Sequence, residues 1–157
     1  MTPELPRTPG PLPPVYVVAA ALAEWALHAW LPIVQWLAWP WRWVGLLFVL
    51  KGLILAALGR WQYRRHRTSA TPFTESDVLV TGGLFEWTRN PMYSGLLLAL
   101  AGEALLFGSV GPWLVMPVIW LVFTQLFIRK EEAGMKLQFG QEYEEYCQRV
   151  NRWGVGK

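Results

Sequence analysis

The sequence predicts an all-α integral membrane protein, with about four transmembrane helices and a C-terminal amphipathic helical segment. Of its 157 residues, 54% are hydrophobic and only 16% are charged, whereas a soluble domain of this size carries about 25% charged residues. The charges are also unevenly spread, since Glu103 is the only charged residue between positions 91 and 128. Abundant apolar residues exclude disorder, and a single cysteine, Cys147, excludes a disulfide scaffold.

Four apolar stretches approach the length of about 20 residues that a membrane-spanning helix needs. They are residues 15–38, 41–59, 92–110 and 112–128. We expect residues 1–14 to form a proline-rich leader and residues 15–157 to form one membrane domain.

The breaks between these stretches have simple causes. Pro40 is expected to separate the first two helices, because proline disrupts a helix interior. Four tryptophans around that break, Trp36, Trp39, Trp41 and Trp43, are typical of an interfacial aromatic belt. The glycine-rich segment 108–112 predicts a tight turn between the last two helices.

Basic residues predict the orientation in the membrane. Four arginines lie within residues 60–67, and Arg129 and Lys130 follow the fourth apolar stretch, whereas the opposite turns carry only Arg42. The positive-inside rule therefore places both termini and the 60–91 loop in the cytoplasm. In a bacterium the membrane would be the inner one. A net charge of +3 without a suitable basic cluster gives no indication of nucleic-acid binding.

The C-terminal part has helical periodicity of a different kind. Phe139, Tyr143, Tyr146 and Val150 are spaced four, three and four residues apart, which predicts one apolar stripe. Gly140 is expected to interrupt this segment. The simplest interpretation is an amphipathic helix on the membrane surface. Residues 68–88 are expected to form a surface or re-entrant loop.

A first candidate site lies at the start of the third apolar stretch. Pro91 suits the first turn of a helix, and Asn90 suits the capping position before it. Free amides at a helix start favour an anion, and Arg89 offers a bidentate partner for a carboxylate or phosphate. The alternative is that Asn90-Pro91 only starts the helix and that Arg89 only anchors it at the interface.

A second candidate site is the carboxylate pair Glu131-Glu132. Adjacent helical residues point about 100° apart, so at most one glutamate readily faces a site while the other faces solvent or a basic neighbour. A solvated helix with local ion pairs is the plainer alternative for one of them.

Four ionisable residues fall near the middle of the predicted spans: Glu24, His28, Lys51 and Glu103. Such residues usually face a partner or a cavity. They predict either a structural cluster, such as Glu24 with Lys51, or the lining of an acceptor pocket. The residues alone do not name a catalytic base. No metal site is expected, because His28 and His66 are far apart and Cys147 lacks a nearby ligand partner.

The two candidate sites together resemble the isoprenylcysteine carboxyl methyltransferase family and its phospholipid N-methyltransferase relatives. That family's signature is Arg-His-Pro-x-Tyr, a hydrophobic helix and then Glu-Glu. The resemblance covers residues 72–153. It rests on Arg89-Asn90-Pro91-Met92-Tyr93-Ser94-Gly95, then Glu131-Glu132, Leu137, Phe139-Gly140, Tyr143, Tyr146 and Arg152-Trp153.

The resemblance implies an integral-membrane methyltransferase that uses S-adenosyl-L-methionine and has no Rossmann domain. The implied acceptor is lipid-like or a small hydrophobic molecule, methylated on a carboxylate, an amine or a thiol. The implied cofactor-binding residues are Arg89, Asn90, Pro91, Tyr93, Glu131, Glu132, Gly83 and Tyr143. Asn90 replaces the family's histidine, so a role that needs a titratable imidazole does not carry over.

Two other functions are compatible with the same motifs. One is an NADPH-dependent reductase of the sterol type, which resembles this family over the same C-terminal helices. The other is a non-catalytic membrane protein that keeps the fold.

Overall fold

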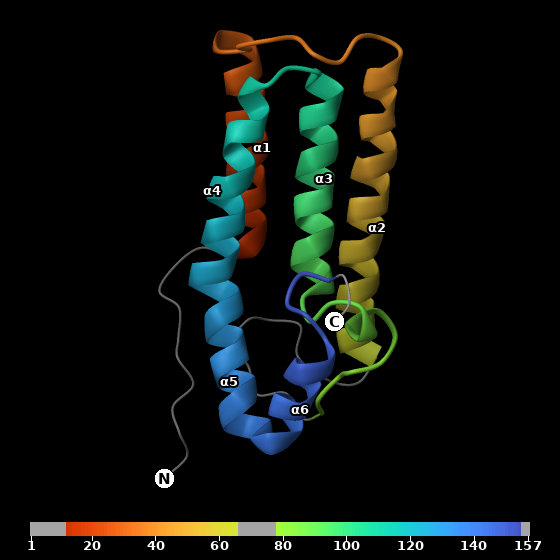
Figure 1. Ribbon diagram of the computed structural model, residues 1–157, viewed down its shortest axis with the longest axis vertical. Coiled ribbons are helices and arrows are strands. Elements are labelled where there is room, and N and C mark those ends of the chain that lie inside the picture. Colours follow the sequence, from red (N-terminus) through yellow and green to blue (C-terminus); the bar gives the residue numbers. More distant parts are fainter. Residues whose placement is uncertain (1–11, 66–77, 155–157) are drawn as a thin grey trace.

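The computed structural model describes residues 12–65 and 78–154, and within these ranges the regular structure is helical. The main helices are α1 (Pro13–Trp30), α2 (Val44–Arg65) and α3 (Pro91–Phe107). They are followed by a nearly continuous rod of α4 (Val115–Val122), the π-helical turn η4 (Phe123–Ile128) and α5 (Arg129–Phe139), and then by α6 (Gln141–Arg149) (Figure 1). The predicted all-α class is confirmed.

The first helix ends earlier than expected. We predicted a helix over residues 15–38, but α1 ends at Trp30 and residues 31–40 form an irregular connection to the 3₁₀ turn η1 (Trp41–Trp43). Pro32 explains the difference, because a proline disfavours helical geometry in the residue before it, here Leu31. Helix α1 therefore ends at Trp30, eight residues before the expected end at residue 38.

A seam of small residues joins α2 to α3. The buried residues of α2 are Gly45, Gly52 and Gly59, which are seven apart and share one face. A Cβ atom built on Gly52 would lie 2.5 Å from the carbonyl oxygen of Gly95, and one on Gly95 would lie 2.5 Å from that of Gly52. The two backbones are therefore in direct contact, which is how small residues allow membrane helices to associate.

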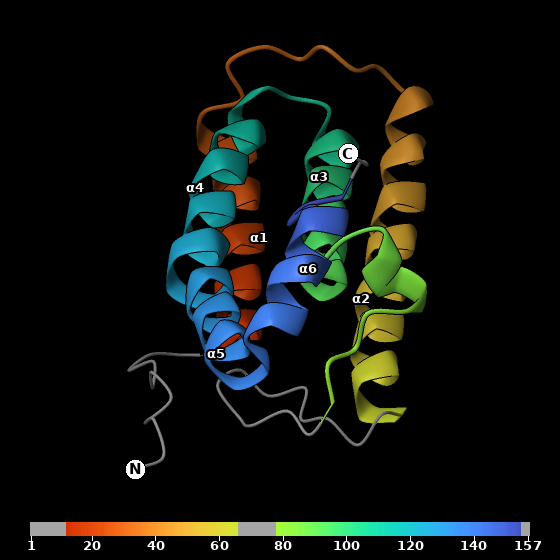
Figure 2. The ribbon, with the colours of Figure 1, turned by 60° about the horizontal axis from the view of Figure 1, so that its bottom comes forward.

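The main core lies among α1, α3 and the α4–η4 rod. Its buried members include Leu100, Ile119, Phe123 and Phe127, and the ring of Tyr16 packs edge-on against Phe127 at 5.5 Å between centroids. Figure 2 shows α2 on the opposite side of α3 from α1 and α4. Because α2 contributes only its glycine seam, most of its apolar side chains remain exposed.

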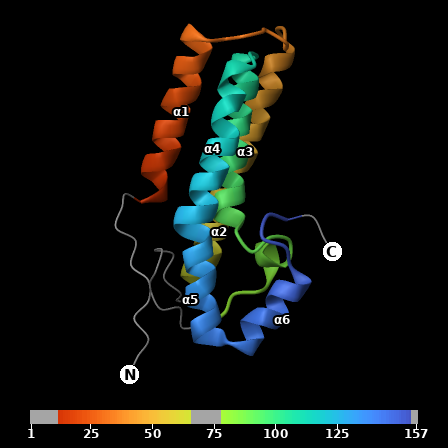
Figure 3. The same cartoon turned by 60° about the vertical axis from the view of Figure 1, so that its left-hand side comes forward.

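The predicted turn between the last two apolar stretches is confirmed. Helix α3 ends at Phe107, and Gly108 adopts a positive φ of 67° at its C-cap. The 3₁₀ turn η3 (Gly111–Leu114) then leads into α4. This turn makes α3 and α4 an antiparallel pair (Figure 3).

Two of the described helices are long and apolar enough to cross a membrane, Trp41–Arg65 and Gly111–Phe139. Helix α3 is a shorter apolar helix of 17 residues. Helix α1 has 18 residues but carries Glu24 and His28. The two long helices agree with a membrane protein, and four complete spans stay a prediction.

The C-terminal helices fold back onto the protein. Gly140, with a φ of 51°, ends α5 as predicted, and α6 returns beneath α3 (Figures 1 and 3). The stripe packs against Val80 and Phe85, and three of its members are buried: Tyr143, Tyr146 and Val150. This stripe therefore packs on a segment of the protein and not on the membrane, and a position of α6 at the membrane surface stays a prediction.

Candidate functional site

The start of α3 is held by the C-terminal segment and not by a side-chain cap. Pro91 occupies the first helical turn as predicted, and Asn90 precedes it, but the Asn90 side chain makes no capping hydrogen bond. Its Nδ2 instead donates to the backbone oxygen of Arg152 at 3.1 Å. Asn90 therefore occupies the expected capping position, but its side chain ties the start of α3 to the end of the chain and does not cap the helix.

Further hydrogen bonds align residues 88–90 with residues 151–152. The backbone amide of Arg89 donates to the carbonyl of Asn151 at 3.0 Å. The hydroxyl of Thr88 donates to the carbonyl of Arg152 at 2.9 Å. These bonds place Arg152 beside Arg89, although the two residues are far apart in the sequence.

Arg89, Glu132 and Arg152 form an ion cluster at this junction, which we call the arginine–glutamate cluster. Arg89 Nη2 lies 3.3 Å from Glu132 Oε1, and Arg152 Nε donates to the same oxygen at 3.0 Å. Arg152 Nη2 also pairs with Glu132 Oε2, and Arg89 Nη1 donates to Cys147 Sγ. The hydrogen bond to Glu132 raises the pKa of Arg152, so its guanidinium stays charged. Two cations share one carboxylate.

Glu131 faces a different partner. The hydroxyl of Tyr93 donates to Glu131 Oε1 at 2.8 Å, and the Tyr93 ring is almost fully buried beside Phe123 and Phe127. The two glutamates thus diverge as the helical geometry predicted, one towards a tyrosine and the other towards arginines. Both glutamates are partly buried, so neither is the solvated residue of the plainer alternative.

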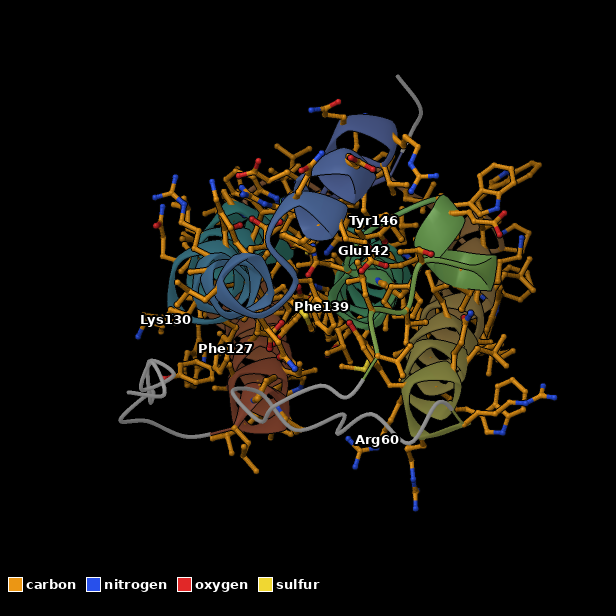
Figure 4. The ribbon with its side chains drawn as sticks, turned by 90° about the horizontal axis from the view of Figure 1, so that it is seen from below. Arg60, Phe127, Lys130, Phe139, Glu142 and Tyr146 are labelled. Atoms are coloured by element: carbon orange, nitrogen blue, oxygen red, sulfur yellow. The ribbon has the colours of Figure 1, made fainter. Side chains whose placement is uncertain are left out.

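Two tyrosines of α6 pack against the segment before α3. Tyr146 donates its hydroxyl proton to the carbonyl of Phe85 at 2.7 Å. Figure 4 shows Tyr146 on the side of α6 that faces this segment. Burial raises the pKa of Tyr146. Burial, followed by the negative charge of Glu132, raises the pKa of Tyr143. Both phenols therefore remain protonated hydrogen-bond donors near neutral pH.

Gly83 has a local structural explanation. Its φ is 63°, and its amide donates to Glu86 Oε1 at 3.1 Å. Gln62 of α2 donates to the carbonyl of Gly82 at 2.6 Å, and a Cβ on Gly83 would lie 2.5 Å from Gln62 Nε2. The turn explains the glycine without a ligand, and the role of Gly83 in cofactor binding stays a prediction.

Two buried donors at the junction lack a hydrogen-bond partner among the described residues, Arg89 Nε and Trp153 Nε1. Buried hydrogen-bond donors almost always have an acceptor, so we expect an acceptor from outside the described residues at each of these two atoms. The sequence placed Arg152 and Trp153 in the family resemblance but not among the cofactor-binding residues. Their participation depends on the pairing of two segments that are distant in sequence, which no local pattern reveals.

The ionisable residues of the helical bundle do not form the expected Glu24–Lys51 pair. Glu24 is fully buried on α1, and neither carboxylate oxygen has a partner among the described residues. Lys51 is exposed on α2, and α1 packs instead against α3, α4 and η3. This prediction was wrong because α2 lies beyond α3.

Comparison with known proteins places these features in a family. The model of the phospholipid methyltransferase family matches residues 40–142. A probable protein-S-isoprenylcysteine O-methyltransferase of Oryza sativa subsp. indica is 30% identical over 116 residues, covering 72% of this chain and 60% of the rice protein. A protein-S-isoprenylcysteine O-methyltransferase of Schizosaccharomyces pombe is 34% identical over 82 residues, covering 52% of this chain and 34% of the yeast protein.

A solved structure has a similar fold. It is that of a eukaryotic intramembrane Ras methyltransferase, an isoprenylcysteine carboxyl methyltransferase, with a TM-score of 0.64 at 22% identity. The similarity covers 89% of this chain and 50% of the solved one. The chain thus spans between about a third and three fifths of the length of these named relatives.

The family match covers well over half of the chain and includes both candidate motifs, Arg89–Tyr93 and Glu131-Glu132. The fold of the solved methyltransferase agrees with it, and so does the resemblance inferred from the sequence. These comparisons and the apolar helices identify an integral membrane protein. The chain belongs to the phospholipid methyltransferase family, in its isoprenylcysteine carboxyl methyltransferase-like part.

Proposed function

We propose that this protein is an integral-membrane methyltransferase that uses S-adenosyl-L-methionine and methylates a lipid-like or small hydrophobic acceptor. The observation that carries the proposal is the arginine–glutamate cluster, which joins the start of α3, helix α5 and the C-terminal segment. Family membership supplies the reaction class, and the cluster supplies a site with both signs of charge.

The chemistry of the cluster fits the proposed cofactor. S-adenosyl-L-methionine carries a carboxylate, an ammonium group and a ribose diol, besides the electrophilic methyl group on its sulfonium. The unpartnered donors Arg89 Nε and Trp153 Nε1 suit a carboxylate. Glu131 and Glu132 would accept hydrogen bonds from the ammonium and ribose groups. Asn90, Pro91, Tyr93, Gly83 and Tyr143 complete the proposed set of cofactor-binding residues.

The residues of this site would act mainly by positioning. Methyl transfer needs the acceptor in line with the bond that breaks, and binding alone supplies such alignment. The Tyr93–Glu131 hydrogen bond fixes the side chains of α3 and α5 relative to each other. Phe123 and Phe127 pack on the Tyr93 ring from the buried core and hold it in place beside Glu131.

The proposed membrane arrangement has four spans, formed by α1, α2, α3 and the α4–η4 rod, with both termini in the cytoplasm. The basic residues Arg60, Arg64 and Arg65 near the end of α2 lie at the same end of the bundle as the start of α3 (Figure 1). This arrangement places the site at the cytoplasmic boundary, where a water-soluble cofactor and a bilayer-borne acceptor meet.

Calorimetric titration of the detergent-purified protein tests the proposal. S-adenosyl-L-methionine and S-adenosylhomocysteine are each titrated, with NADPH as a parallel ligand. We expect saturable binding of the first two, weakened about tenfold or more by Arg89→Ala and by Glu132→Ala, because each removes a partly buried charge partner. NADPH is expected to give no saturable heat.

Matched control variants separate the site from general charge effects. Arg149→Ala and Glu144→Ala make the same changes at exposed positions of α6, and both should bind as the parent protein does. Binding of NADPH alone would move the protein to the reductase class. If the folded protein binds none of the three ligands, the protein is a relative that keeps the fold without the activity.

A further inference from the structure

Glu24 is a buried acid that the proposed methyl-transfer site does not use. It lies in the middle of α1, its exposed fraction is 0%, and both carboxylate oxygens lack a hydrogen-bond partner among the described residues. Burying an acid without a partner is costly in a protein interior, and more so within a membrane. The burial of Glu24 becomes less costly if a hydrogen-bond donor from outside the chain reaches its carboxylate or if its carboxyl group keeps a proton.

A second carboxylate faces the same region. Glu103 of α3 is partly exposed and lies within electrostatic range of Glu24. The two acids belong to helices α1 and α3, which pack against each other. Because Glu103 is partly exposed and Glu24 is buried, a molecule that enters from the bilayer would reach Glu103 first.

Three basic residues of the bundle, His28, Arg42 and Lys51, are either engaged elsewhere or exposed. His28, one turn after Glu24, hydrogen-bonds through Nδ1 to Ser109 Oγ at 2.8 Å and stacks on Phe107. Arg42 donates to the Leu37 carbonyl and to Gln35 Oε1, both at 2.7 Å. Lys51 is exposed on α2. The acid pair therefore has no cationic partner among these three residues.

The acid pair is also remote from the arginine–glutamate cluster. Glu103 lies ten residues after Tyr93 on α3, which corresponds to roughly 15 Å along the helix axis. A ligand group held by the acid pair would therefore not be the methyl group or its immediate acceptor atom. The pair is a separate feature, deeper in the bundle.

We propose that Glu24 and Glu103 form a membrane-embedded binding site for the protonated amine of a single-chain amphiphile. Fully buried carboxylate oxygens without donors, beside a partly exposed second carboxylate, suit an ammonium group, which brings one positive charge and up to three N–H donors. The alkyl chain would lie along the apolar surfaces of α1 and α3. This inference goes beyond the proposed methyltransferase activity and does not depend on it.

Native mass spectrometry of the detergent-purified full chain tests the inference, with dodecylamine as the probe and 1-dodecanol as its neutral counterpart. We expect one saturable dodecylamine per chain. Glu24→Gln and Glu103→Gln should each weaken its binding about tenfold or more, because each removes the charge while keeping the side-chain shape. Glu145→Gln, the same change at an exposed position of α6, should leave it unchanged.

Two outcomes would overturn the inference. One is dodecylamine binding that both glutamine variants retain, and the other is 1-dodecanol binding as tightly as the amine; either would mean that Glu24 and Glu103 do not bind the ammonium group. Thermal unfolding of the same preparations shows whether each variant is folded, and if one glutamine variant fails to fold, the other decides. Binding of S-adenosyl-L-methionine is measured separately, so the failure of either proposal leaves the other intact.

Discussion

The Tyr93 hydroxyl donates a 2.8 Å hydrogen bond to Glu131 Oε1, which directly links the two motifs of the family signature. Tyr93 lies in the first turn of α3 and Glu131 in the first turn of α5. The link lies beside the arginine–glutamate cluster, since Glu132 is the next residue. Cofactor binding is therefore expected to depend on the relative position of α3 and α5.

Replacing Tyr93 by phenylalanine should weaken the proposed cofactor site. The change leaves the Glu131 carboxylate without its donor, at an expected cost of about 1–3 kcal/mol. We expect the affinity for S-adenosyl-L-methionine, measured by calorimetry, to fall about fivefold or more. Tyr16→Phe makes the same change on α1 and should leave the affinity unchanged. Equal affinities of Tyr93→Phe and the parent protein would argue against a role for this hydrogen bond.

Glu132→Gln should destabilise the protein much more than a matched exposed change. It leaves Arg89 and Arg152 without a counter-charge in a partly buried cluster, for an expected cost of about 2–3 kcal/mol. Glu144→Gln breaks the exposed pair with Lys136, which has an N–O distance of 2.7 Å and is expected to contribute at most about 1 kcal/mol. Thermal unfolding monitored by tryptophan fluorescence compares the two variants. Equal shifts in the unfolding temperature of Glu132→Gln and Glu144→Gln would contradict a stabilising role of the arginine–glutamate cluster.

The glycine seam predicts a sharp difference between two glycine substitutions. Gly52→Ala would place a methyl group against the backbone of α3, so α2 and α3 must separate, with an expected cost of about 1–3 kcal/mol. Gly82→Ala meets only an ordinary contact, 3.8 Å from Glu86 Oε1, and should be neutral. Thermal unfolding and expression level measure both. An unchanged unfolding temperature of Gly52→Ala would show that the backbones of α2 and α3 pack less closely at the glycine seam than the geometry indicates.

The proposed orientation predicts which end of the bundle is accessible from outside the cell. In a Cys147→Ser background, cysteine replaces either Trp39 or Arg64, which are both exposed and lie at opposite ends. A membrane-impermeant maleimide applied to intact cells should label Trp39→Cys. It should label Arg64→Cys only after permeabilisation, because the positive-inside rule places Arg64 in the cytoplasm. The reverse pattern would invert the topology.

The sequence by itself determined the helical class, the membrane character, the turn at residues 108–112, the break at Gly140 and the family. These follow from local properties: apolar runs favour helices whose backbone hydrogen bonds are internal, and the motifs lie within short segments. The end of α1 differs from the predicted boundary because Pro32, also a local feature, ends the helix at Trp30.

Only the tertiary structure decided which side chains meet. The Asn90 side chain makes no capping hydrogen bond and donates to the Arg152 carbonyl, and Arg152 reaches Glu132 because residues 88–90 pair with residues 151–152. The glycine faces of α2 and α3 join directly, which leaves Lys51 exposed and Glu24 without the predicted partner. Such pairings depend on how whole helices pack, since a side chain's partner is set by the competing contacts of every neighbouring element and not by its position in the sequence.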